Sequence, residues 1–353
     1  MEMRFYMEKT YLPLEHHYRL IKGNTPKMRW DGKEDISAWQ SRAKEKLAEL
    51  LGLDEIEKFR VPLEVEIEFD KYTDDLDARE IRFRFTSEKN VVSVAHLFIP
   101  RGYEGKKLPI MVTVCGHGTG MHLTQNRAKF PGDKEILDRK RDTYYIPIAL
   151  SHGLAALSLE QRGFGENGGN PVNGHPRCTE IAKRAIILGR TLIGERIWDI
   201  MRCIDALHHS FSNLVDLNKI LMMGNSGGGT ATTYASVFDD RIKISIPSCA
   251  VCDWSESIGI MEHCFCNYVP YIAKHFDMGD IVAIMAPKRA VVVSGIIDNG
   301  FLLDGAESSV ATARRVYSAL GESDNLVHVI GQSDHRFYAD DSYPHIMKFV
   351  SEI

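Results

Sequence analysis

The chain has 353 residues, with 43 Lys and Arg against 48 Asp and Glu, which leaves a formal net charge of −5. It has no basic cluster of the kind that follows a phosphate backbone, so we expect no nucleic-acid partner. No stretch reaches the roughly 18 uninterrupted apolar residues of a membrane span, and the first residues lack the apolar core of a signal peptide. These observations predict a cytoplasmic protein with no membrane partner.

Hydrophobic residues make up 44% of the chain, which is enough for a large core at this length. We therefore expect one large α/β domain with additions rather than two equal domains. The seven cysteines are an odd number in apolar or strand-like segments, which favours reduced thiols. No disulfide framework is indicated.

Residues 1–60 are charged and helical in character. A helical pattern runs through residues 36–51, and Gly52 directly after it is a typical helix stop. We predict that residues 1–60 form an N-terminal helical extension and that residues 61–353 form the main domain.

The hydrophobic pattern changes twice along the main domain. Residues 63–69, 81–85 and 91–99 alternate between apolar and polar side chains, which predicts antiparallel strands with one wet face. After residue 107 the pattern becomes short continuous apolar runs separated by helical segments, as in a parallel sheet covered on both faces. These runs are residues 108–114, 154–159, 220–223, 242–246, 290–293 and 326–330. We therefore predict a mostly parallel central sheet flanked by helices, with a partly helical insertion near residues 254–288.

Ser226 lies at the centre of the most informative motif, Gly224-Asn225-Ser226-Gly227-Gly228, which directly follows the run at 220–223. A serine held in a tight strand-to-helix turn needs neighbours without a Cβ atom two positions before and two after it. Gly224 and Gly228 fill these positions. The motif predicts an exposed nucleophile at the N-terminus of a helix, and the alternative is a glycine-rich turn without chemistry.

A serine nucleophile needs a histidine base and a carboxylate that orients the histidine. Asp298 follows the run at 290–293, and His335 follows the last run. Both lie where a parallel sheet ends its strands, and the order Ser226, Asp298, His335 is the order of an α/β hydrolase. Asp253 is the second choice for the carboxylate, and Asp304 is the third.

An oxyanion hole needs two backbone N–H groups, one of them from the residue after the nucleophile. Gly227 is that residue. The loop at 115–120 follows the run at 108–114, and we predict that the amide of His117 or Gly118 is the second donor. The ring of His117 is expected to hydrogen-bond locally and to do no chemistry, with catalysis by the ring as the alternative.

The combined motifs resemble the α/β-hydrolase superfamily from about residue 62 to the end. The likeness is strongest to its acetyl xylan esterase-like and dienelactone hydrolase-like branch. It is carried by residues 115–118, 161–166, 198–205, 224–229, 286–289, 295–298 and 334–338.

This resemblance implies a serine ester hydrolase that forms an acyl-enzyme intermediate. The expected substrate is a small-molecule ester with a small acyl group, such as an acetylated carbohydrate. Two alternatives stay open: a short-peptide hydrolase of the prolyl oligopeptidase type, and a catalytically silent hydrolase fold used for binding. The sequence also leaves open whether the chain forms homo-oligomers.

The insertion carries further candidates for binding. Trp254 and Tyr268 are predicted to bind substrate by stacking on a sugar, and core packing is the alternative for both. A zinc site is conceivable from ligand spacings at five residues, namely Cys249, Cys252, His263, Cys264 and Cys266. Because a serine triad requires no metal, we prefer buried thiols and predict neither a metal nor a cofactor.

Overall fold

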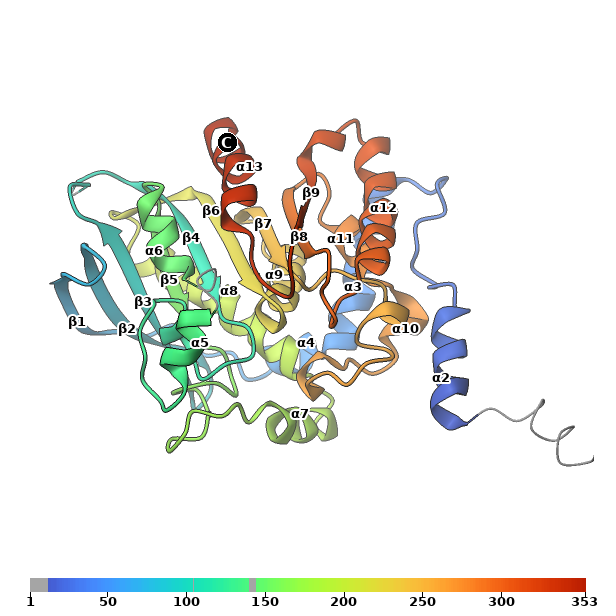
Figure 1. Cartoon of the computed structure of the whole chain (residues 1–353), viewed down its shortest axis with the longest axis horizontal. Helices are drawn as coiled ribbons and strands as arrows, with labels where there is room; N and C mark the ends of the chain where they lie inside the picture. The colour runs from blue at the N-terminus through green and yellow to red at the C-terminus, as the bar shows by residue number, and fades with distance from the viewer. Residues whose placement is uncertain (1–11, 104, 140–143) are drawn as a thin grey trace, which may run out of the picture.

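The computed structural model describes residues 12–103, 105–139 and 144–353. These residues form a nine-stranded sheet in the order β1-β2-β3-β5-β4-β6-β7-β8-β9 (Figure 1). The strands are β1 Val65–Thr73, β2 Ala78–Glu88, β3 Val91–Pro100, β4 Leu108–Val114, β5 Ala155–Leu159, β6 Val215–Asn225, β7 Ile242–Ser248, β8 Arg289–Gly295 and β9 Leu326–Gly331.

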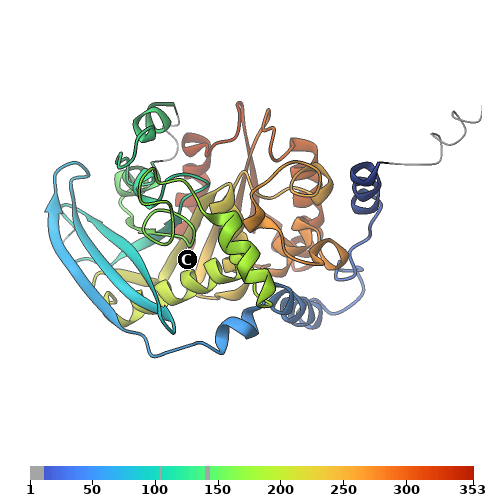
Figure 2. The ribbon, with the colours of Figure 1, turned by 90° about the horizontal axis from the view of Figure 1, so that it is seen from below.

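The sheet has an antiparallel part and a parallel part, and each follows its sequence pattern. Strands β1, β2 and β3 pair antiparallel, and β3 also pairs antiparallel with β5. From β5 through β4 to β9 every neighbouring pair is parallel. The prediction of a mostly parallel central sheet is confirmed. Figure 2 shows β1 to β3 curving away at one end of the molecule.

Helices cover both faces of the sheet. They are α2 Pro13–Lys22, α3 Ile36–Leu51, α4 Leu53–Glu57, α5 Asp133–Arg139, α6 Tyr145–Ser151, α7 Cys178–Ile187, α8 Leu192–Ser210, α9 Gly227–Phe238, α10 Ile272–His275, α11 Met278–Ile284, α12 Leu303–Ala319 and α13 Ala339–Glu352. Side chains on a strand alternate between faces, so β6 sends Ile220 and Met222 into the core beneath α8, α9 and α12. Leu221 and Met223 enter the second core, beneath α6 and α13. Two-sided burial explains the continuous apolar runs.

The predicted N-terminal extension is divided in the structure. Helix α3 begins after Asp35, whose side chain accepts a hydrogen bond from the amide of Ala38, and ends at Gly52 with φ 73°. One side of α3 lies in the main core through the residues Trp39, Ala43, Leu47 and Leu51. Helix α2 has no buried residue and stands apart from the other helices in Figure 2. Residues 1–11 of the extension lie outside the described residues.

The segment at 254–288 is partly helical. It contains the short turns η3 Trp254–Glu256 and η4 Phe265–Asn267, followed by α10 and α11. Of the helices that the structure describes, none has the length and apolar character needed to cross a membrane.

Candidate active site

Ser226 occupies a strained turn between β6 and α9. Its backbone has φ 57° and ψ −126°, a region that residues with a side chain rarely adopt. The turn is held because the Ser226 amide donates to the carbonyl of Ser248 at 2.8 Å. A Cβ atom on Gly224 would overlap the backbone of Gly228, and one on Gly228 would lie 2.5 Å from the carbonyl oxygen of Val114. The two glycines are therefore required sterically.

Ser226 opens into a pocket of about 220 Å³ at the carboxyl ends of the parallel strands. His335 lines the same pocket from the loop after β9, and His117 and Gly118 line it from the loop after β4. The structure thus brings three separate predicted segments to one cavity. Its remaining lining residues are Cys115, Gly116, Leu123, Thr124, Ile136, Tyr145 and Asn225.

Asp298 holds the ring of His335 from behind. The Nδ1 atom of His335 lies 2.8 Å from Oδ2 of Asp298. The other carboxylate oxygen accepts hydrogen bonds from the amides of Gly300 at 2.8 Å and Phe301 at 3.1 Å. Burial raises the pKa of Asp298, but the bonds from His335 and the two amides outweigh this effect, so the pKa is lowered overall. Asp298 is therefore a fixed carboxylate, and a ring that donates from Nδ1 keeps Nε2 as its acceptor.

The two alternative carboxylates do not contact His335. Asp253 accepts a hydrogen bond from the hydroxyl of Ser309 at 2.7 Å. Asp304 is exposed in the first turn of α12. Among the three candidates, the geometry favours Asp298.

The loop after β4 lies directly against the serine turn. A Cβ atom on Gly116 would lie 2.8 Å from the carbonyl oxygen of Asn225 and 3.3 Å from Cβ of Ser226. A Cβ atom on Gly227 would lie 2.8 Å from Cε1 of His117, so the imidazole packs against the first residue of α9. The absence of side chains on Gly116 and Gly227 lets the loop and the helix N-terminus approach each other this closely.

Glu160 supports the same loop from inside the protein. It is almost fully buried, and Oε1 accepts a hydrogen bond from the amide of Met121 at 2.9 Å. Burial raises the pKa of Glu160 to about 7, although the Met121 amide opposes the shift. The loop is therefore supported by a buried carboxyl group whose pKa lies near neutral pH.

Trp254 and Tyr268, the predicted substrate-binding aromatics, are not among the residues that line the serine pocket. Trp254 belongs to the main core, and its indole N–H donates to the carbonyl of Phe276 at 2.7 Å. Trp254 therefore packs in the core and not in the pocket as predicted, and its buried indole N–H has there the acceptor that it needs. Tyr268 is 37% exposed and lies beside the ring of Phe265.

The pocket wall contains residues that the sequence analysis missed. Leu123, Ile136 and Tyr145 supply apolar surface from the segment between β4 and β5. No motif marks them, because a pocket wall requires only shape and polarity. Only the position of this segment, directly after the loop at 115–120, could have indicated that it lines the pocket.

The five-residue zinc alternative is not assembled. Cys249 and Cys252 have their sulfur atoms near backbone carbonyls, at 3.2 Å from Arg336 and 3.4 Å from Leu302 respectively. His263 faces the carbonyl of Gly300 at 3.0 Å. Cys264 and Cys266 instead gather with two residues from elsewhere in the chain, His117 and Cys178. The expected local hydrogen bond of the His117 ring is corrected to a long-range contact, because Nε2 lies 3.2 Å from the Cys266 sulfur.

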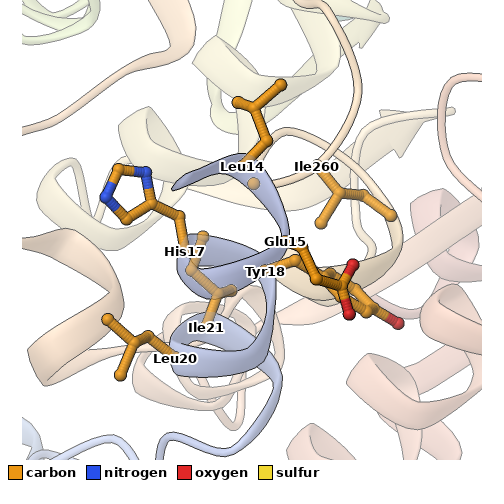
Figure 3. A pocket seen from close by; sticks show the side chains of 8 residues that line it. Leu14, Glu15, His17, Tyr18, Leu20, Ile21 and Ile260 are labelled. Atoms are coloured by element: carbon orange, nitrogen blue, oxygen red, sulfur yellow. The ribbon is translucent and has the colours of Figure 1, made fainter. Parts of the chain in front are cut away.

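A larger hollow of about 650 Å³ lies between α2 and the turn at 259–260 and shares no lining residue with the serine pocket (Figure 3). Its side chains include Leu14, Leu20 and Ile260, and its polar ones are Glu15, His17 and Tyr18. The smaller pocket places Ser226, which has a strained backbone, beside His335, whose ring is held by a buried carboxylate. A nucleophile with an oriented base is what covalent catalysis uses, so the serine pocket is the candidate active site.

No protein-family model matches the chain. It is 27% identical over 244 residues to the "Putative hydrolase YtaP" of Bacillus subtilis, covering 68% of this chain and 77% of the relative. A "putative acetyl xylan esterase" of Bacteroides fragilis superposes with a TM-score of 0.73 and 15% identity, covering 95% of this chain and 84% of the other. A glucuronoyl esterase of Solibacter usitatus has a TM-score of 0.66 and 15% identity, with 93% and 97% covered. The chain therefore has the α/β-hydrolase fold.

Proposed function

We propose that this protein is a serine ester hydrolase in which Ser226 is the nucleophile, His335 the base and Asp298 the carboxylate that orients the base. One observation carries the proposal. The strained serine at the end of β6 shares a pocket with a histidine whose Nδ1 is 2.8 Å from a buried carboxylate. This is the arrangement that serine hydrolases of this fold require.

The reaction follows from these positions. His335 Nε2 takes the proton of the Ser226 hydroxyl while the oxygen attacks the ester carbonyl. The amides of Gly227 and of His117 or Gly118 stabilise the resulting oxyanion, aided by the N-terminus of α9. The tetrahedral intermediate then expels the alcohol, which takes its proton from His335. Water, deprotonated by the same histidine, attacks the acyl-enzyme and releases the acid and the free serine.

The pocket favours a small acyl group. Its volume is about 220 Å³, and its apolar wall is made by Leu123, Ile136 and Tyr145. The similar structures from Bacteroides fragilis and Solibacter usitatus carry names of carbohydrate esterases. We therefore propose an ester of a carbohydrate, with an acetyl group as the first choice, as the substrate class.

The test uses a fluorophosphonate probe, which labels activated serines, together with p-nitrophenyl acetate. The wild type should be labelled at one residue and should hydrolyse the ester, whereas Ser226→Ala should lose both properties. The control is Ser333→Ala, which removes a hydroxyl from the loop that carries His335 and should keep both. An unlabelled, inactive wild type, or an active Ser226→Ala, would overturn the proposal.

A substrate panel then tests the class. Acetylated xylo-oligosaccharides, a glucuronic acid methyl ester and short chromogenic peptides are compared by kcat/KM at equal enzyme concentration. We expect the acetylated sugars to be preferred. A preference for peptides would mean that the protein is a peptidase that uses the same serine chemistry. Labelling without turnover of any substrate in the panel would contradict the proposed substrate class.

A further inference from the structure

Four side chains of the kinds that can ligate a metal meet beside the serine pocket, which one of them, His117, also lines. His117 belongs to the loop after β4, Cys178 begins α7, and Cys264 and Cys266 flank the start of η4 in the insertion. One ligand atom from each lies within 4.8 Å of each of the others. The His117 Nε2 atom is 3.2 Å from the Cys266 sulfur. The four residues come from three segments that are far apart in the sequence.

We propose that these four residues bind one zinc ion through the imidazole Nε2 of His117 and the thiolates of Cys178, Cys264 and Cys266. Three sulfurs and one imidazole nitrogen form a ligand set that zinc takes in structural sites. With a Zn–S bond of about 2.3 Å, sulfur ligands at tetrahedral angles lie about 3.8 Å apart. The observed separations of up to 4.8 Å thus need only a small inward movement of the side chains. The cysteines are free thiols in the structure.

The charge around the cluster supports a metal. Binding releases three thiol protons, so a divalent ion with three thiolates and a neutral imidazole carries a net charge of −1. The guanidinium of Arg196 lies beside the cluster, with Nη2 3.0 Å from the Cys178 sulfur. A single buried cation next to the cluster would balance the charge of the complex.

Arg196 lacks a conventional partner for its charge. It is 1% exposed, and in the described part of the chain its hydrogen-bond partners are a backbone carbonyl and a cysteine sulfur, with no carboxylate among them. Its Nε and Nη2 atoms donate to the carbonyl of Arg162, its Nη1 atom has no hydrogen-bond partner, and its guanidinium lies over the ring of Phe164 at 4.5 Å. A buried charge without a counterion is costly, so an anionic metal–thiolate complex at Cys178 accounts for its placement.

The ion would be structural and not catalytic, because four protein ligands leave no position open for substrate or water. The ion would affect the region around Ser226 through His117, because the ring of His117 packs against Gly227. A metal on Nε2 would fix that ring and, through it, the loop whose amides we propose for the oxyanion hole. This second step depends on the proposed esterase function, whereas metal binding does not.

The experiment measures metal content directly. The protein is produced in zinc-supplemented medium, purified under reducing conditions without chelator, and analysed by inductively coupled plasma mass spectrometry. The wild type should contain about one zinc per chain. Cys264→Ser, which alters a partly exposed ligand, and Cys178→Ser should lose most of the metal. Cys252→Ser is the matched control, a buried thiol outside the cluster, and should keep the full amount.

Cobalt keeps the proposal testable if the ligand variants fold poorly. Chelator-stripped wild type is titrated with Co²⁺, and thiolate-to-cobalt charge-transfer absorption should saturate at one equivalent. Ser226→Ala should bind zinc and cobalt like the wild type, which separates this proposal from the esterase proposal. A wild type that holds no metal as purified and shows no cobalt absorption would overturn the proposal. So would a disulfide among the three cysteines, detected by intact mass without reductant, or metal loss in Cys252→Ser equal to that in Cys264→Ser.

Discussion

The ring of His335 is held between two partners, with Nδ1 2.8 Å from Oδ2 of Asp298 and its face stacked on Phe301 at a centroid distance of 5.8 Å. The second oxygen of Asp298 is occupied by two backbone amides. The carboxylate therefore cannot rotate without losing both sets of bonds, and it determines which ring nitrogen faces the pocket.

Asp298→Asn should lower kcat on p-nitrophenyl acetate by about 10³- to 10⁴-fold with little change in melting temperature. The amide oxygen can still accept from the backbone at residues 300 and 301, which turns the amide NH₂ toward His335. That arrangement favours the tautomer protonated at Nε2, which cannot accept the proton of Ser226. Steady-state kinetics and thermal unfolding measure the two effects.

Asp253→Asn is the control for this substitution, because Asp253 is the alternative carboxylate and bonds to Ser309 instead. It should retain wild-type kcat. Loss of activity in Asp253→Asn together with an active Asp298→Asn would contradict our choice of carboxylate.

Gly116→Ala should impair catalysis through the contact between the loop after β4 and the serine turn. The added methyl group would lie 2.8 Å from the carbonyl oxygen of Asn225, a backbone atom that cannot move aside cheaply. We expect kcat to fall on the order of 10-fold or more, because small displacements of reacting groups are costly. The rate of fluorophosphonate labelling should fall with it. Gly23→Ala adds the same group at the end of α2 and should change neither rate, and equal rates in wild type and Gly116→Ala would refute the expectation.

Glu160→Gln should change how stability depends on pH. The pKa of Glu160 is raised to about 7 from its ordinary value of 4.5, so between these pH values the folded state holds a proton that the unfolded state has lost. The stability contribution of Glu160 is thus complete below pH 4.5 and is lost as the pH rises toward 7. Relative to wild type, the variant should gain on the order of 3 kcal/mol in free energy of unfolding across this range. Urea denaturation at a series of pH values measures the difference.

Glu80→Gln is the control, with the opposite sign. Burial raises the pKa of Glu80, but hydrogen bonds from His96 and Arg127 outweigh it and lower the pKa to about 2. Its contribution is complete above pH 4.5 and is lost as the pH falls toward 2. The free energy of unfolding of Glu80→Gln should therefore approach that of the wild type as the pH falls below 4.5. If the difference from wild type changed with pH in the same direction for both variants, the two pKa shifts would be contradicted.

Leu47→Ala tests whether helix α3 belongs to the main core. Leu47 is fully buried in the same cluster as β6 and α8. Truncating it should lower the free energy of unfolding by about 2–5 kcal/mol, because it removes apolar contact and leaves a cavity. The control is Glu45→Ala on the exposed side of α3, which should change stability by less than about 0.5 kcal/mol. Equal stability of the two variants would mean that α3 is dispensable.

The parts of the candidate site that sequence analysis predicted correctly depend on local sterics. A serine flanked by Gly224 and Gly228 indicates a tight turn whatever surrounds it, and the structure has Ser226 at φ 57°. The alternation and the continuous apolar runs likewise predicted which strands are half-buried and which are covered on both faces. Such patterns are carried by neighbouring residues and are readable in order along the chain.

Contacts between residues far apart in the chain decided where the sequence left alternatives open or gave a wrong prediction. Asp298 and Asp253 both follow parallel strands, and the path of the loops placed one beside His335 and the other beside Ser309. Trp254 was assigned to the pocket because aromatic residues suit sugars, but its indole found a buried acceptor in the core. Side-chain chemistry alone does not distinguish these outcomes.

The sequence by itself determined the α/β fold, the tight turn at Ser226 and the order of the candidate residues, because these follow from backbone sterics and from hydrophobic periodicity over short stretches. Only the tertiary structure revealed that His117 and Cys178 join Cys264 and Cys266. The reason is physical: a ligand cluster is made by segments far apart in the chain, and their meeting depends on how helices and loops pack on the sheet. The cysteine spacing near residue 264 left a metal open only as the alternative to buried thiols, and the other two members of the cluster were visible only after folding.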